Sequence, residues 1–203
     1  MNAPVDERSS NQKKHESNNP IQRGLIDNFH AKAIAMVNRA KPGSILELGC
    51  GEGYVLDAFV RGGVQAELTG VELDERAVGK AQARLGSRAT IEHEDARKLA
   101  ADGRRFDMVM MLEVLEHIPE PEQMLPIIDE LSTEWILVSV PWEPVFCALN
   151  FMRGKNITRW GNDIDHVNHW SRRGFAEFIG SRFEIVEQPG VFPWTMLLAR
   201  KRS

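Results

Sequence analysis

The chain has 203 residues, which is enough for the core of one domain but not for two full domains. Its formal net charge of −4 argues against a general nucleic-acid binder, so no DNA partner is expected and RNA is disfavoured. The two cysteines form no disulfide framework, no apolar run is long enough to span a bilayer, and no signal-peptide core opens the sequence, so a cytoplasmic protein is expected.

The N-terminal part of the chain divides into a polar segment and a helix. Residues 1–20 are rich in Asn, Ser, Lys, Glu and Gln with almost nothing to bury, so a disordered tail is expected there. A single domain is expected over 21–203. Its first predicted element is a helix at about 24–40, which ends before the Lys41-Pro42-Gly43 break.

Strand-like and helix-like segments then alternate. Strands are predicted at about 44–48, 67–72, 89–93, 107–112 and 135–140, and helices at about 54–61, 75–85 and 121–131. Such alternation predicts an α/β fold with a doubly wound, mostly parallel sheet and helices on both faces.

After Pro141 the pattern changes. An acceptor-side insertion is expected at about 142–170, followed by a helix near 171–180. Two apolar stretches, 183–188 and 192–199, are predicted to pair as an antiparallel hairpin at the sheet edge. The expected sheet therefore has seven strands.

The most informative segment is ILELGCGEGYVL at residues 45–56, an apolar strand that runs into closely spaced glycines and then a helix. Such a unit brings backbone close to a nucleotide ligand. Gly49, Gly51 and Gly53 follow a GxGxG spacing that differs from the dinucleotide fingerprint GxGxxG. Glu47 places a carboxylate at the strand end, where it would repel a pyrophosphate and favour a cation. Alternatively, Glu47 pairs with a buried Arg or Lys.

This segment resembles motif I of the class I S-adenosylmethionine-dependent methyltransferases, whose fold is Rossmann-like. The resemblance implies S-adenosylmethionine as the cofactor. It places Glu47 opposite the amino group of the methionine part and brings the backbone around Gly49 and Gly51 close to the same part.

Two further strand ends extend the predicted cofactor site. Glu72 ends the second strand, where an acid can accept hydrogen bonds from both ribose hydroxyls, and Leu73 would offer an apolar edge to adenine. The resemblance implies that Asp95 receives the adenine amino group and that Ala96 donates its backbone N–H to the ring. As structural alternatives, Glu72 is a surface carboxylate and Asp95 caps the next helix.

The fourth strand leads into the segment FDMVMMLEVLEHIPEPE, which delivers Leu112 and Glu113 to the cofactor edge and carries Glu116 and His117 in a turn. It resembles the E-V-x-E-H segment of the ubiquinone-biosynthesis O-methyltransferases, which implies that His117 points into the substrate cleft. A histidine with a near-neutral pKa suits a general base for the acceptor oxygen. Alternatively, His117 has only a structural role in the turn before Pro119.

A metal site is a second interpretation of the same segment. Glu113, Glu116 and His117 resemble the Glu-x-x-Glu-His segment of the small-RNA 3′-terminal 2′-O-methyltransferases, which use another downstream histidine. His166 and His169 are candidates here. Mixed carboxylate and imidazole ligands suit magnesium or manganese. No metal ligand is assigned, because such segments occur in many members for which no metal is inferred.

The acceptor pocket is expected beyond the fifth strand, where Trp142, His166 and His169 are the candidate substrate-binding residues. The aromatic density of this region suits an apolar or aromatic acceptor, or else a plain hydrophobic cap over the sheet. Its basic residues suit a solvated face, an anionic substrate or RNA phosphate. Aromatic and basic residues together also allow peripheral contact with a membrane surface.

The favoured function is a methyltransferase that acts on an oxygen of a small-molecule acceptor by in-line displacement. The alternatives are a metal-assisted RNA 2′-O-methyltransferase, a non-catalytic cofactor-binding module and, as another enzyme class, a NAD-dependent dehydrogenase. The sequence identifies neither the acceptor nor the oligomeric state.

Overall fold

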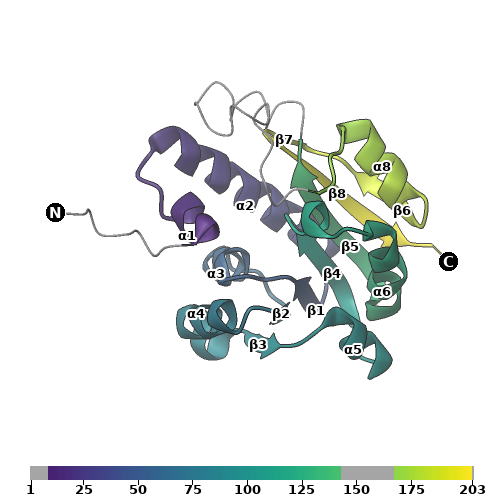
Figure 1. The fold of residues 1–203 in the computed structure, drawn as a ribbon, viewed down its shortest axis with the longest axis horizontal. Coiled ribbons are helices and arrows are strands. Elements are labelled where there is room, and N and C mark those ends of the chain that lie inside the picture. The colour runs from purple at the N-terminus through teal and green to yellow at the C-terminus, as the bar shows by residue number, and fades with distance from the viewer. Residues whose placement is uncertain (1–8, 143–166, 203) are drawn as a thin grey trace.

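A computed structural model describes residues 9–142 and 167–202. Its strands are β1 Ser44–Leu48, β2 Glu67–Glu72, β3 Thr90–His93, β4 Phe106–Leu112, β5 Ser132–Pro141, β6 Phe183–Glu187, β7 Gly190–Val191 and β8 Trp194–Lys201. They form one sheet in the order β3-β2-β1-β4-β5-β8-β6, with β7 paired to β8 (Figure 1). β1 to β5 pair in parallel, and β8 runs antiparallel to its neighbours. The predicted fold class is confirmed.

The C-terminal strands differ in two details from the expected hairpin. Among the described residues the sheet has eight strands instead of seven, because Gly190 and Val191, expected within a simple connection, pair with the start of β8 as β7. β8 also lies between β5 on one side and β6 and β7 on the other, so of the two strands predicted as the hairpin only β6 lies at the edge of the sheet. β8 is buried from Trp194 to Ala199, whereas β6 alternates between buried and exposed positions. The more apolar strand thus occupies the inner place.

Helices cover both faces of the sheet. They are α1 Ser10–His15, α2 Pro20–Ala40, α3 Tyr54–Arg61, α4 Glu75–Leu85, α5 Ala96–Ala101, α6 Met124–Leu131 and α8 Arg172–Gly180. Buried residues of α2, α3 and α4 share one core cluster with strand residues such as Ile45. Those of α5, α6 and α8 share a second cluster with the alternate strand residues, such as Leu46. Burial on both faces explains why the central strands are continuous apolar runs.

Most predicted elements occur at or within a few residues of their expected bounds. The predicted bounds 44–48, 54–61, 67–72 and 75–85 match β1, α3, β2 and α4. The helix expected at 121–131 opens as a 3₁₀ turn, η3 Pro121–Gln123, before α6. α2 begins earlier than expected because Asn19 Oδ1 accepts a hydrogen bond from Ile21 N at 2.9 Å and caps it.

The expectation of a disordered tail over residues 1–20 is wrong for part of that segment. Residues 1–8 lie outside the described part of the chain, but Ser10–His15 forms α1. Ser9 Oγ caps this helix by accepting a hydrogen bond from Gln12 N at 2.9 Å, and it donates to Glu52 Oε1 at 2.9 Å. The expectation was based on the scarcity of apolar residues in this segment. α1 is instead held largely by hydrogen bonds and ring contacts, which composition does not reveal.

The region expected to form the acceptor-side insertion is described only at its two ends. Residues 143–166 lie outside the described part of the chain. No helix in 9–142 or 167–202 is long and apolar enough to cross a membrane.

Candidate functional site

The predicted site residues converge because the carboxyl ends of neighbouring parallel strands lie at one edge of the sheet. Glu47 on β1 is in register with Gly70 on β2 and Met110 on β4. Glu72 closes β2 and Leu112 closes β4 at the same edge. This is the edge at which doubly wound sheets bind ligands.

The glycine loop depends on backbone conformations that favour glycine. Gly49, Gly51 and Gly53 have φ values of 70°, 53° and 75°. A Cβ atom added to Gly49 would lie 2.8 Å from Val114 Cγ2, so even a methyl group has no room. Gly49 N donates to Val71 O at 2.9 Å, which ties the loop to β2. The conformation of the loop therefore requires glycine at these positions.

Glu47 is a buried acid at the head of this loop. It is only 2% exposed, and its Oε2 atom has no hydrogen-bond partner among the described residues. Burial, and then the charge of Glu72, raise the pKa of Glu47 to about 8. A buried carboxylate without a partner is costly, and a bound cation would relieve that cost. Glu47 therefore fits the amino group of an amino-acid ligand. The alternative partner, a buried Arg or Lys, does not contact Oε2 in the described structure.

Glu72 joins the glycine loop to the turn after β2. Its Oε2 atom accepts a hydrogen bond from Gly51 N at 2.9 Å. Its Oε1 atom accepts from Leu73 N at 2.7 Å and from Asp74 N at 3.0 Å. A carboxylate offers about four acceptor sites, so Glu72 can still accept from a hydroxyl. Leu73 is 66% exposed beside it, an unusual exposure for leucine that suits contact with a flat apolar group.

Asp95 has the capping contact that was its structural alternative. Its Oδ1 atom accepts a hydrogen bond from Arg97 N at 2.8 Å and so caps α5, whose first residue is Ala96. An adenine contact through Oδ2, which lies 3.4 Å from an Arg97 guanidinium nitrogen, is compatible with the cap. The two roles can coexist, and the adenine role stays a prediction.

The end of β4 is tied to β5. Leu112 is buried, and the next residue, Glu113, has a φ of 60°, which is rare outside glycine. Glu113 N donates to Ser139 O at 3.1 Å, and Ser139 Oγ donates to Glu113 Oε1 at 3.0 Å. Both contacts hold Glu113 on the neighbouring strand.

His117 lies in the 3₁₀ turn η2 Leu115–His117 that follows β4. Its N–H donates to Val114 O at 3.0 Å, and its side chain is 43% exposed. Glu116 is buried, and its Oε1 atom lies 3.9 Å from His117 Nε2. The imidazole is therefore reachable by a ligand and lies near a carboxylate.

A distant segment packs on this turn. Val167 N and Asn168 N donate to Glu116 O at 2.9 and 3.2 Å, and Asn168 Nδ2 donates to Leu115 O at 3.2 Å. The described start of the segment before α8 is thus fixed beside His117. His169, the next residue, is exposed. His166 lies outside the described residues.

Trp142 leaves β5 toward the turn before β8. Its N–H donates to Pro193 O at 3.0 Å, and the Arg172 guanidinium carbon lies 5.7 Å from the centre of a Trp142 ring. These contacts hold Trp142 directly after the carboxyl end of β5. Its role in binding a substrate stays a prediction.

The described part of the chain contains no cluster of side chains that would support the metal interpretation. Over 9–142 and 167–202, no three His, Cys, Asp or Glu side chains are grouped as metal ligands. Glu113 is engaged with Ser139, and His166 is not described.

Sequence reasoning gave no role to Glu52, a buried acid within the glycine loop. Its Oε1 atom accepts hydrogen bonds from Lys80 Nζ at 2.8 Å and Ser9 Oγ at 2.9 Å. The sequence feature that could have drawn attention to Glu52 is its place between Gly51 and Gly53, because a charged residue within a glycine loop is unusual. Tyr54, the first residue of α3, donates to Glu16 Oε1 at 2.7 Å.

The comparisons with known proteins agree with this geometry. Residues 45–132 match the family model described as a methyltransferase domain. Ubiquinone biosynthesis O-methyltransferase from Aromatoleum aromaticum is 36% identical over 81 residues, which cover 38% of this chain and 34% of that protein. The protein of the same name from Roseobacter denitrificans is 35% identical over 157 residues, which cover 73% of this chain and 60% of that protein. The chain thus spans less than two thirds of these relatives.

Solved structures extend the likeness of the fold. Magnesium protoporphyrin IX methyltransferase from Synechocystis PCC 6803, solved with bound SAH (S-adenosylhomocysteine), has a TM-score of 0.67 at 19% identity. The match covers 91% of this chain and 88% of that one. Residues 45–132 therefore belong to a methyltransferase domain, and the chain is similar to the S-adenosylmethionine-dependent methyltransferases of class I and to the ubiquinone-biosynthesis O-methyltransferases, as its motifs predict.

Proposed function

We propose that this chain transfers the methyl group of S-adenosylmethionine to an oxygen atom of a small-molecule acceptor, aromatic or lipid-like in character. The observation that carries the proposal is Glu47, a buried carboxylate with an unpaired oxygen at the head of a glycine loop. The methionine part of S-adenosylmethionine carries a positively charged ammonium group, and the Glu47 carboxylate is suited to bind it. The name shared by the relatives supports the acceptor class.

The remaining cofactor residues follow the sheet edge. The backbone around Gly49 and Gly51 would approach the methionine part, because glycine carries no side chain of its own at these two positive-φ positions. Glu72 would accept hydrogen bonds from the ribose hydroxyls. The adenine and the rest of the cofactor are proposed to contact Leu73, Asp95, Ala96 and Leu112.

His117 is the proposed general base. S-adenosylmethionine supplies an electrophilic methyl group on a positively charged sulfur. An imidazole nitrogen of His117 would accept the proton of the acceptor hydroxyl, so that the oxygen is a stronger nucleophile when it displaces the sulfur in line. The nearby Glu116 carboxylate would stabilise the imidazolium that forms. Trp142, His166 and His169 are proposed to contact the acceptor.

Titration calorimetry with S-adenosylhomocysteine and NAD tests the cofactor proposal. Micromolar binding of S-adenosylhomocysteine without NAD binding is expected, because Glu47 would oppose a pyrophosphate. Binding of NAD alone would overturn the proposal in favour of a dehydrogenase. Binding of S-adenosylhomocysteine without turnover on any acceptor would indicate a non-catalytic cofactor module.

Turnover assays separate the acceptor classes. Methylation of phenolic or lipid-like hydroxyls that is insensitive to a chelator is expected. Chelator-sensitive methylation of RNA 3′ ends would instead support the metal-assisted alternative. The cytoplasmic location and peripheral membrane contact stay predictions from composition.

A further inference from the structure

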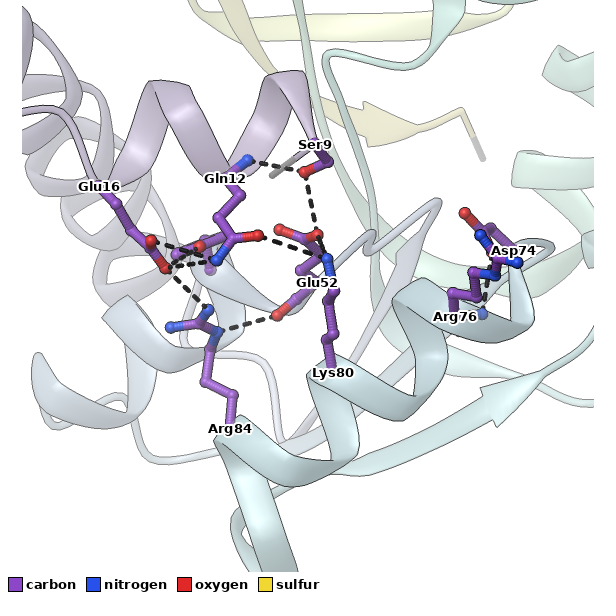
Figure 2. Close-up of polar contacts among 9 residues, drawn as sticks. Ser9, Gln12, Glu16, Glu52, Asp74, Arg76, Lys80 and Arg84 are labelled. Carbon is purple, nitrogen blue, oxygen red and sulfur yellow. Dashed lines mark hydrogen bonds and ion pairs between the residues drawn. The ribbon is translucent and has the colours of Figure 1, made fainter. Parts of the chain in front are cut away.

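Three segments far apart in the sequence meet at Glu52 (Figure 2). Lys80 comes from α4 and Ser9 from the start of α1, and both donate hydrogen bonds to Glu52 Oε1. Glu52 is only 4% exposed, so its carboxyl group has little contact with water and is held by these two donors. Figure 2 shows Glu52 between Ser9 and Lys80. One buried carboxylate therefore joins the glycine loop to two helices.

The other end of α1 is tied to the same region. Glu16, which caps the C-terminus of α1, accepts a hydrogen bond from Tyr54 Oη at 2.7 Å. The Arg84 guanidinium carbon lies 3.7 Å from the Tyr54 ring centre, and Arg84 Nε donates to Glu52 O at 3.0 Å. The His15 ring stacks on Tyr54 with 4.3 Å between centres. We call Ser9, Glu16, Glu52, Tyr54, Lys80 and Arg84 the α1 clamp.

The α1 clamp shares backbone with the proposed cofactor site. Glu52 follows Gly51, whose N–H donates to Glu72 Oε2. α4, which carries Lys80, begins after its cap Asp74, whose N–H donates to Glu72 Oε1. Movement of Glu52 would therefore displace the loop that faces the cofactor.

α1 has only six residues, and a helix of that length is not stable alone in water. Its formation is therefore coupled to its contacts with the glycine loop and α4. For an element that exchanges between a docked and an undocked state, a ligand that stabilises the loop conformation favours the docked state.

We propose that α1 is a strap that docks on the glycine loop through the α1 clamp and stabilises the cofactor-binding conformation of that loop. The inference rests on the proposed use of S-adenosylmethionine and adds a regulation of the same site. Docking of α1 and cofactor binding are then linked, and each strengthens the other by the same factor. Glu52 acts as a positioning residue.

Two clamp variants test the strap without removing a large side chain. Ser9→Ala removes the bond to Glu52 and the α1 cap, and Tyr54→Phe removes the bond to Glu16. The matched control is Asn19→Ala, which removes the cap of α2 and no described contact with the loop. The double variant that combines Ser9→Ala and Tyr54→Phe should bind S-adenosylhomocysteine about tenfold more weakly by calorimetry, because two hydrogen bonds to carboxylates are lost. Asn19→Ala should leave the affinity within about twofold of the wild type.

Amide hydrogen exchange gives the second readout. S-adenosylhomocysteine should slow exchange over residues 10–15 in the wild-type protein and in Asn19→Ala, and this protection should be lost in the double variant. Unchanged affinity in the double variant, or no protection of α1 on binding, would overturn the strap while the proposed function stands. Absence of S-adenosylhomocysteine binding to the wild-type protein would instead overturn the proposed function, and the strap with it.

Discussion

The carboxyl edge of the sheet has two parts, which we call the cofactor end (the loops after β1 and β2) and the acceptor end (the segments after β4 and β5) after their proposed roles. The two parts are held by different kinds of contact. At the cofactor end, short loops after β1 and β2 bond to each other, as in the contact from Gly51 N to Glu72 Oε2. At the acceptor end, η2 is fixed by Val167 and Asn168, which lie far along the chain. The first kind of contact lies within a compact motif, whereas the second depends on how the whole chain folds.

The two ends also differ in exposure and charge. Glu47 is buried, and its raised pKa disfavours the charged form until a cation binds. The His117 side chain is 43% exposed, so solvent and ligands can reach it. On the proposed function, the buried acid would bind the charged end of the cofactor, whereas the acceptor would meet an exposed imidazole.

The largest expected effect is on turnover, in a variant of the acceptor end that leaves cofactor affinity unchanged. His117→Ala should lower kcat by about 10² to 10⁴-fold, which is the usual contribution of a general base. Its affinity for S-adenosylhomocysteine should stay within about twofold of the wild type, because His117 belongs to the acceptor end. Steady-state kinetics and calorimetry measure the two quantities. Full turnover in His117→Ala would refute the general-base role, and the exposed Glu120→Ala serves as the neighbouring control.

The reciprocal variant is Glu47→Gln, which keeps the shape of the side chain and removes its charge. Affinity for S-adenosylhomocysteine should fall about 100-fold, because the ligand ammonium loses a buried ionic partner. Calorimetry measures this, with the exposed Glu184→Gln on β6 as the matched control. Equal affinity in both variants would show that Glu47 does not bind the cofactor.

The buried acid also predicts a pH dependence of stability without ligand. The pKa of Glu47 is about 8 in the folded chain and near 4.5 when unfolded, so between these values the folded state holds the extra proton. Stability contributed by Glu47 is therefore lost as pH rises from 4.5 to 8, by roughly 2–5 kcal/mol. Urea unfolding across this range should show the loss in wild type and its absence in Glu47→Gln. A parallel pH dependence in both proteins would contradict the raised pKa.

Smaller effects are expected from the glycines. Gly53→Ala should lower the free energy of unfolding by about 1–2 kcal/mol, because φ is 75° and the new Cβ would lie 2.9 Å from Leu85 Cδ1. Gly79→Ala, at an exposed position in α4 with open space around it, should raise it by about 0.5–1 kcal/mol. Thermal unfolding compares them. A stabilising Gly53→Ala would show that the loop does not need its left-handed backbone.

Much of the cofactor end could be predicted from the sequence because its information is local. The strand ends that carry Glu47 and Glu72 follow from apolar runs and glycine spacing, and the register of parallel strands brings them to one edge. The unpaired oxygen of Glu47 could not be predicted, because it depends on what other elements leave beside it.

The remaining features depend on long-range packing. The contact of Asn168 with Leu115 and the docking of α1 on Glu52 join segments with no shared sequence pattern. The place of β8 between β5 and β6 likewise depends on which strand buries more apolar surface. Periodicity predicted each strand but did not determine the order in which they pair.

Proton release on ligand binding tests the role of Glu47 most directly. At pH 7 the Glu47 carboxyl of the free protein is largely protonated, because its pKa is about 8. Binding of an ammonium group should expel that proton. Calorimetry of S-adenosylhomocysteine binding in buffers with different ionisation enthalpies should therefore show release of about one proton in wild type and none in Glu47→Gln. Equal proton release in the two proteins, or none in wild type, would contradict the assignment of Glu47 as the partner of the cofactor's amino group.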